Sequence, residues 1–164
     1  MIMTKKLMTL LLAMLALTAC NSDEKDAKET RVTPGDLMAP YFLNGIEQYC
    51  FWTFSGTEAA YGTDVSDYIT EGMKVKCDAF YSSWSLDNGH LILDESETHK
   101  ISRLEPAGGY IIKIDDAQYL PSTNAKHGNI IDKYLMQSGF TKQMLMDAMR
   151  ESFETDTIVV IKWY

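Results

Sequence analysis

Short stretches of alternating apolar and polar residues, separated by turn residues, constrain the fold of this chain most strongly. In residues 73–81 apolar side chains occupy every other position and polar ones, such as Lys74 and Lys76, lie between them, which predicts a half-buried strand. Asp87-Asn88-Gly89 tolerates positive φ and predicts a tight hairpin. The predicted strands cover residues 49–54, 73–81, 82–86, 90–94, 99–104 and 110–115. Because strands joined by short turns pair antiparallel, they predict a β-meander.

The segments around these strands are less regular. The apolar phase changes near Tyr81, since Trp84 and Leu86 have the other parity, and this predicts a bulge or bend. Residues 31–44 contain two prolines and are expected to enter the domain as turns. Residues 61–64 also have the composition of a turn, within a stretch of ambiguous pattern.

The last third of the chain has helical periodicity followed by a β-branched run. Residues 130–137 predict a short helix, and Thr141 is a suitable N-cap for a second helix over residues 142–153. Residues 158–164 predict a strand that returns to the sheet, and the β-branched apolar run over residues 158–161 is typical of an interior strand. The expected fold class is α+β: an antiparallel meander that curves into a partial or closed barrel, with two C-terminal helices and a final strand.

The start of the chain predicts its cellular address. Residues 1–19 have a basic start, an apolar run and small residues before a cleavage point, which is the design of a secretory signal peptide. Leu17-Thr18-Ala19-Cys20 resembles the lipobox of bacterial lipoproteins. The resemblance implies cleavage before Cys20, a diacylglycerol on its sulfur and acylation of the new N-terminus, so that the membrane is one partner. The alternative is an ordinary signal peptide that leaves Cys20 unmodified.

Residues 20–33 are expected to form a disordered acidic tether that precedes a single domain over residues 34–164. Ser22-Asp23-Glu24 is similar to the acidic signals that send lipoproteins of some gut anaerobes to the outer membrane, with exposure on the cell surface as a further expectation. The chain carries a formal net charge of -8. This charge repels phosphate backbones, so no nucleic-acid partner is expected.

An aromatic strand, an acidic Asn-Gly hairpin and a strand that ends in leucine follow one another through the sheet region. The residues of this pattern are Trp52-Thr53-Phe54-Ser55-Gly56-Thr57, Tyr81, Trp84, Leu86-Asp87-Asn88-Gly89-His90-Leu91, Leu93, Lys100-Ile101 and Leu104. The pattern, which covers residues 46–115, resembles the small lipocalin-like lipoproteins of Gram-negative bacteria. That resemblance implies a lipocalin-like barrel and carries over no catalytic residue.

Aromatic residues on the inner face of such a curled sheet would line an apolar pocket, although aromatic side chains most commonly form core. The candidate ligand-lining residues are Trp52, Phe54, Tyr81, Trp84 and Tyr110.

Once Cys20 is lipidated, Cys50 and Cys77 remain as an even number of cysteines in an oxidising compartment. Two interpretations stay open: a disulfide between neighbouring strands, and two buried free thiols. Neither cysteine lies in a CxxC motif, so redox catalysis is not expected.

No pattern of catalytic or metal-ligating residues stands out. His90, His99 and His127 lack the spacing of metal ligands, and the adjacent Asp115 and Asp116 would point to opposite faces of a strand. We therefore expect no metal, no cofactor and no enzymatic activity.

The sequence predicts a non-enzymatic, outer-membrane-anchored lipoprotein that binds a small or apolar ligand. The alternative is a surface interaction protein that binds a protein or glycan partner through an exposed aromatic patch. A hydrolase would need a cleft with convergent carboxylates or histidines.

Overall fold

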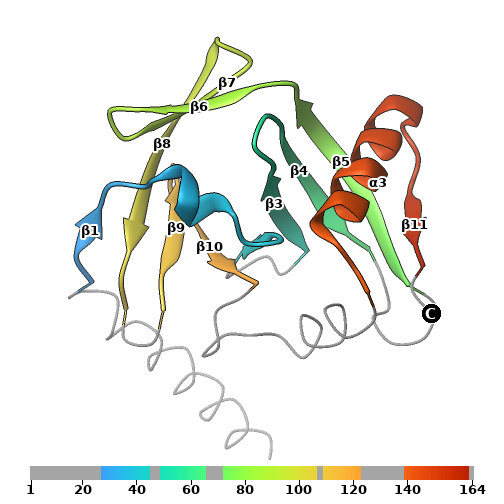
Figure 1. Cartoon of the computed structure of the whole chain (residues 1–164), viewed down its shortest axis with the longest axis horizontal. Coiled ribbons are helices and arrows are strands. Elements are labelled where there is room, and N and C mark those ends of the chain that lie inside the picture. The colour runs from blue at the N-terminus through green and yellow to red at the C-terminus, as the bar shows by residue number, and fades with distance from the viewer. Residues whose placement is uncertain (1–26, 45–48, 66–71, 107–108, 123–138, 163–164) are drawn as a thin grey trace, which may run out of the picture.

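The computed structural model describes residues 27–44, 49–65, 72–106, 109–122 and 139–162 (Figure 1). Within these ranges the chain forms an antiparallel sheet, a short 3-10 helix and one α-helix. In chain order the elements are β1 (Glu29–Thr30), η1 (Pro34–Leu37), β2 (Phe42–Asn44), β3 (Cys50–Phe54), β4 (Ala59–Asp64), β5 (Met73–Tyr81), β6 (Trp84–Asp87), β7 (His90–Leu93), β8 (Glu97–Leu104), β9 (Ile111–Ile114), β10 (Ala117–Pro121), α3 (Lys142–Thr155) and β11 (Val159–Ile161).

The sheet consists of two meanders that pair with each other through one edge strand of each. Its strand order is β11-β5-β4-β3-β2-β10-β9-β8-β7-β6, and β1 pairs with β8 off this path. The strands from β2 to β5 form one meander, those from β6 to β10 form the other, and β10 pairs with β2 where they meet. Because neighbouring strands twist relative to one another, the sheet curls into a half-barrel (Figure 1). The order of the described strands has two ends, β11 and β6, so the curl is a half-barrel rather than a closed ring.

These features confirm the predicted α+β class and antiparallel meander. The predicted hairpin is β6–β7, and its turn residues Asn88 and Gly89 have φ of 45° and 80°. The helix predicted over residues 142–153 is α3, and the hydroxyl of Thr141 accepts a hydrogen bond from the Met144 N–H at 3.2 Å. The other predicted helix, residues 130–137, lies outside the described residues.

Three other predictions made from the sequence are wrong. Residues 61–64 belong to strand β4 rather than to a turn, and residues 31–44 contain η1 and β2 as well as turns. Strand β11 lies at an edge of the sheet instead of in its interior. In β4 tertiary packing overrides turn propensity, because both faces of the strand are covered and small residues fit there. A Cβ on Gly62 would lie 2.4 Å from the Lys76 carbonyl oxygen and 3.1 Å from the Met149 methyl carbon.

The predicted change of parity is present, and it occurs in the middle of β5. The β4–β5 register shifts between Tyr61 and Gly62, whose partners are Ala79 and Cys77, so Asp78 is the extra residue of a bulge. Cys77 therefore faces α3, whereas Tyr81, at the end of the same strand, faces the opposite side of the sheet.

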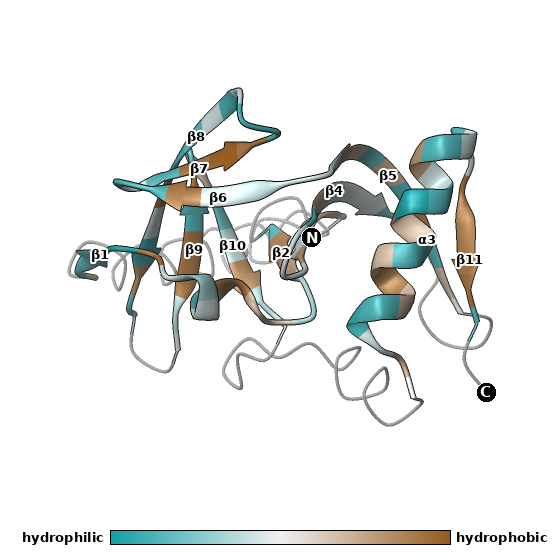
Figure 2. Ribbon diagram, turned by 45° about the horizontal axis from the view of Figure 1, so that its top comes forward, coloured by the Kyte–Doolittle hydropathy of each residue, from teal (hydrophilic) through white to brown (hydrophobic). Residues whose placement is uncertain are grey.

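Two apolar cores lie on opposite faces of the sheet, and Figure 2 shows their hydrophobic strands at β7, β9 and β11. The concave core lies inside the curl, where side chains from facing walls meet. It consists of Val32, Leu37, Ala39, Phe42, Trp52, Phe54, Ala59, Leu91, Leu93, Ile101, Ile112, Ile114 and Tyr119. The helix-side core lies under α3 and consists of Tyr41, Phe51, Ala60, Met73, Val75, Cys77, Phe140, Leu145, Met146, Ala148, Met149 and Ile161.

Residues 32–39, which we call the N-terminal plug, contribute to the concave core. Leu37 is buried completely, and the Asp36 carboxylate accepts hydrogen bonds from the backbone and side chain of Thr33 at 2.8 and 2.7 Å. Asp36 also pairs with Arg103 on β8, and its carbonyl accepts a hydrogen bond from the Tyr110 hydroxyl at 2.8 Å. These contacts hold the plug against the β8–β9 wall.

Candidate functional site

The two cysteines of the described sheet do not form a disulfide. Cys50 pairs with Thr63 on β4 and Cys77 pairs with Gly62 on the same strand, so β4 lies between the strands that carry the two cysteines. They are not cross-strand neighbours, contrary to the geometry that a bridge would require. Burial raises the pKa of Cys77 to about 12, which keeps its thiol protonated and unreactive. Cys20 lies outside the described residues.

Four of the five predicted ligand-lining side chains lie together, but they pack against one another. The Trp52 ring stacks on those of Phe54 and Tyr81 with centroids 5.6 and 6.1 Å apart, and the Phe54 and Trp84 rings meet edge-on at 5.5 Å. Trp52 and Phe54 are buried. Tyr110 lies apart from them, against the plug, where the Arg103 guanidinium covers its ring at 4.6 Å. These aromatics pack against one another at this point of the concave core.

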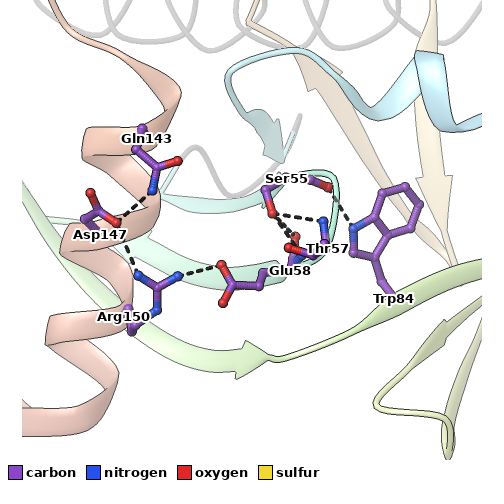
Figure 3. Close-up of polar contacts among 7 residues, drawn as sticks. All are labelled: Ser55, Thr57, Glu58, Trp84, Gln143, Asp147 and Arg150. Carbon is purple, nitrogen blue, oxygen red and sulfur yellow. Dashed lines mark hydrogen bonds and ion pairs between the residues drawn. The ribbon is translucent and has the colours of Figure 1, made fainter.

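A chain of polar contacts runs from α3 through the β3–β4 turn to Trp84 on β6 (Figure 3). The Trp84 indole N–H donates to the Ser55 carbonyl at 2.9 Å, and the Ser55 hydroxyl accepts from the Glu58 N–H at 2.8 Å. Glu58 in turn forms an ion pair of 2.5 Å with Arg150 on α3, and Arg150 contacts Asp147 at 3.2 Å. The network connects β6, the β3–β4 turn and α3, so it holds elements of both cores in place.

His99 forms a three-residue acid–base cluster that the sequence interpretation missed. Its Nδ1 lies 2.8 Å from the Asp115 carboxylate and its Nε2 lies 2.8 Å from the Glu97 carboxylate. Since an ionised carboxylate only accepts, both contacts are hydrogen bonds when the imidazole carries a proton on each ring nitrogen. Burial by itself lowers the pKa of His99, but the hydrogen bonds and charges of Asp115 and Glu97 outweigh it and raise that pKa above its ordinary value.

The cluster lies where the two walls of the half-barrel approach each other. The Trp52 ring from β3 contacts the His99 ring edge-on at 6.5 Å, and the Tyr81 hydroxyl from β5 lies 3.5 Å from the Glu97 carboxylate. Only the contact between Glu97 and His99 has a signal in the sequence, because residues two apart on one strand share a face, whereas Asp115 joins the cluster from the turn after β9.

An open groove of about 460 Å³ lies on the outer face of the sheet, where β1, the β6–β7 turn and β8 meet. The residues that line it include Glu29, Arg31, Asn88, His90, Lys100 and Ser102. Leu91 and Ile101 point into the concave core, so their strand neighbours His90, Lys100 and Ser102 point outward. The sequence interpretation missed this groove, because β1 comes to β8 only through tertiary pairing.

Basic side chains predominate around this groove. His90 lies directly opposite Lys100, and Lys113 lies opposite Ser102 on the same face. The Arg31 guanidinium donates to the Asn88 side-chain oxygen at 3.1 Å. A hydrogen bond from Ser102, with the nearby charges of Lys100 and Lys113, lowers the pKa of Glu29. The arrangement therefore presents the cationic groups of Arg31, Lys100 and Lys113 to solvent, together with the carboxylates of Glu29 and of Asp87, which lies opposite His90.

Comparisons of the chain with protein-family models, with curated proteins and with solved structures find no match. None of the helices in the described ranges has both the length and the apolar composition needed to cross a membrane. Within the same ranges, no group of three or more His, Cys, Asp or Glu side chains is arranged to hold a metal ion.

Proposed function

We propose that this protein is an outer-membrane lipoprotein, anchored through lipid on Cys20, whose folded domain binds a small anionic ligand without chemical conversion. The lipobox residues Leu17-Thr18-Ala19-Cys20 support the anchor, and the lipocalin-like strand pattern supports a ligand-binding role. Several acyl chains on one N-terminus would give stable anchoring, whereas a single chain binds only marginally.

The binding site is the groove between β1, the β6–β7 turn and β8. The observation that carries this assignment is the gathering of Arg31, Lys100 and Lys113 around a groove on a chain with a net charge of -8. Its volume of about 460 Å³ falls in the range of small-molecule sites. Guanidinium and ammonium groups recognise carboxylates and phosphates through charge-assisted hydrogen bonds.

The packing of side chains on the concave face of the sheet favours this outer groove over a ligand site in the lumen that a lipocalin-like barrel would have. The aromatic side chains that would line a lumen stack on one another, with Trp52 at their centre.

Docking of a partner through an exposed aromatic patch has less support. Among the described residues, the large apolar side chains that are exposed include only two aromatics, Tyr49 and Phe153. Tyr49 precedes β3, whereas Phe153 lies on α3 and contacts Phe80. They do not belong to one aromatic cluster.

Calorimetric titration of the full-length protein in detergent micelles tests the groove. The probes are glucuronate and inorganic phosphate, with glucose as the neutral comparison. Replacing Arg31 with Gln or Lys100 with Gln removes a charge-assisted hydrogen bond, and we expect binding of the anionic probe to weaken by about 10-fold or more. Lys162→Gln, at the opposite edge of the sheet, is the charge-matched control. Binding that glucose reproduces, or that both groove variants retain, contradicts the proposal.

Membrane fractionation tests the anchor. Cys20→Ser removes the sulfur that would carry the lipid, so the variant is expected in the soluble fraction, while Cys50→Ser remains with the membrane. A Cys20→Ser protein that stays on the outer membrane shows that another feature anchors it.

A further inference from the structure

Strand β11 is an edge strand whose outward backbone groups can be identified from the register. The Val65 N–H donates to the Lys74 carbonyl at 2.9 Å, so the backbone groups of Lys74 point toward β4. Backbone groups alternate along a strand, so those of Val75 point toward β11, where Val75 pairs with Val159. The N–H and C=O of the next residue, Val160, therefore point away from β5, and no described strand pairs with β11 on that side.

The side chains beside this edge form an uncovered apolar and basic surface. Val159 and Ile161 pack toward α3, so Ile158 and Val160 point to the opposite face of the sheet, where they are 54% and 42% exposed. The register places Lys74 directly opposite Val160. We call Lys74, Ile158, Val160 and the following exposed residue Lys162 the β11 edge surface.

The charge of this surface differs from that of the whole chain. Lys74 and Lys162 contact no carboxylate within the described part of the structure, while Lys76 on the same strand face pairs with Asp156. The chain as a whole carries -8. Lysines beside an edge strand disfavour its pairing with a second copy, whereas an acidic segment is attracted to them at contact distance.

We propose that β11 is a docking site for an extended acidic segment of another protein, which adds to the sheet as an antiparallel strand. Val160 supplies the central pair of backbone hydrogen bonds in this arrangement. Partner residues at alternate positions then lie opposite Lys162, Val160 and Ile158. The matching pattern, from the N-terminus of the partner, is an acidic residue followed by apolar residues two and four positions later.

Addition of a strand also satisfies the outward backbone groups of β11, because unpaired backbone groups recruit other strands. β11 is short and has lysines beside it, which protects its edge against self-association, but it contains no proline and its residues are β-branched throughout. This site lies at the opposite end of the sheet order from the groove beside β7 and β8, so the two proposals are independent.

Fluorescence polarisation with a labelled synthetic peptide tests the inference on the full-length protein in detergent micelles. The probe carries Glu, Val and Ile at alternating positions between threonines, and the comparison peptide carries Lys in place of Glu. We expect the acidic peptide to bind and the basic peptide to bind at least about 10-fold more weakly, as removal of a favourable charge pair implies.

Val160→Pro removes the outward N–H without removing a bond to β5, and prolines are tolerated at such edge positions. We expect this variant to lose peptide binding while its circular dichroism stays unchanged. Lys162→Glu provides a second variant in case the proline disturbs folding, and it should favour the basic peptide over the acidic one. Lys28→Glu, on the segment before β1, is the matched control and should bind as the wild type does.

Three results would overturn the proposal: equal binding of the two peptides, binding that survives both β11 variants, and the absence of measurable peptide binding. Light scattering adds a separate check. A wild-type dimer that Val160→Pro converts to a monomer would identify a second copy, rather than an acidic partner, as the occupant of the edge.

Discussion

The N-terminal plug makes a prediction about stability that depends on a single side chain. Leu37 lies on the four-residue helix η1 and is buried completely in the concave core, between the two walls of the half-barrel. Leu37→Ala deletes three carbon atoms, worth about 2.4 kcal/mol at about 0.8 kcal/mol for each buried group. The cavity left behind adds to this cost, so we expect a loss of about 3 kcal/mol in the free energy of unfolding.

Urea unfolding, followed by tryptophan fluorescence, measures this loss. Thermal unfolding should show a fall in Tm of roughly 12 °C, since about 1 kcal/mol corresponds to about 4 °C for a domain of this size. Met38→Ala is the matched control, because Met38 is the next residue and is 43% exposed. Its effect should stay within about 0.5 kcal/mol. Equal unfolding midpoints for Leu37→Ala and Met38→Ala would show that the plug does not contribute to the core.

Other predictions concern the acid–base cluster, the helix cap and the tight approach of β4 to α3. Because the pKa of His99 is raised from 6.5 in the folded protein, its stabilising effect is present below that value and lost as pH rises through the folded pKa. The Tm difference between wild type and His99→Gln should therefore shrink between about pH 6 and about pH 9, and a constant difference would contradict this reasoning. Thr141→Ala removes the N-cap of α3 and should lower the unfolding free energy by about 1 kcal/mol in urea, with Thr155→Ala as comparison. Gly62→Ala forces a Cβ against the Lys76 carbonyl and should cost about 3 kcal/mol or more by the same assay; a neutral effect would show that β4 and β5 separate easily.

The candidate site illustrates why residue types alone do not locate function here. The sequence identifies Trp52, Phe54, Tyr81 and Trp84 as inward aromatics, and the structure brings these four together. Whether inward aromatics surround a void or fill it depends on the spacing of the walls, which alternation along a strand does not specify. The same spacing decides that Tyr110 lies with the plug, away from this group.

Contacts between segments that are distant in the chain explain the other differences between the sequence predictions and the structure. The His99 cluster joins residues 16 positions apart, and the groove joins Arg31 to Asn88 across 57 positions. Neither pairing has a local signature. Of the two cysteine interpretations, the disulfide fails for a related reason, because two strands with buried cysteines are neighbours only if no other strand pairs between them, and β4 does.

The sequence by itself determined the elements whose pattern is local. The alternation over residues 73–81, the Asn88-Gly89 turn and the Thr141 cap predict β5, the β6–β7 hairpin and α3, because period, positive φ and capping are properties of a few adjacent residues. Only the tertiary structure decided that a turn-like segment becomes β4, that residues 32–39 fill the half-barrel and that β11 lies at an edge. In these cases the stabilising contacts come from distant strands, so burial outweighs the local preference of the backbone.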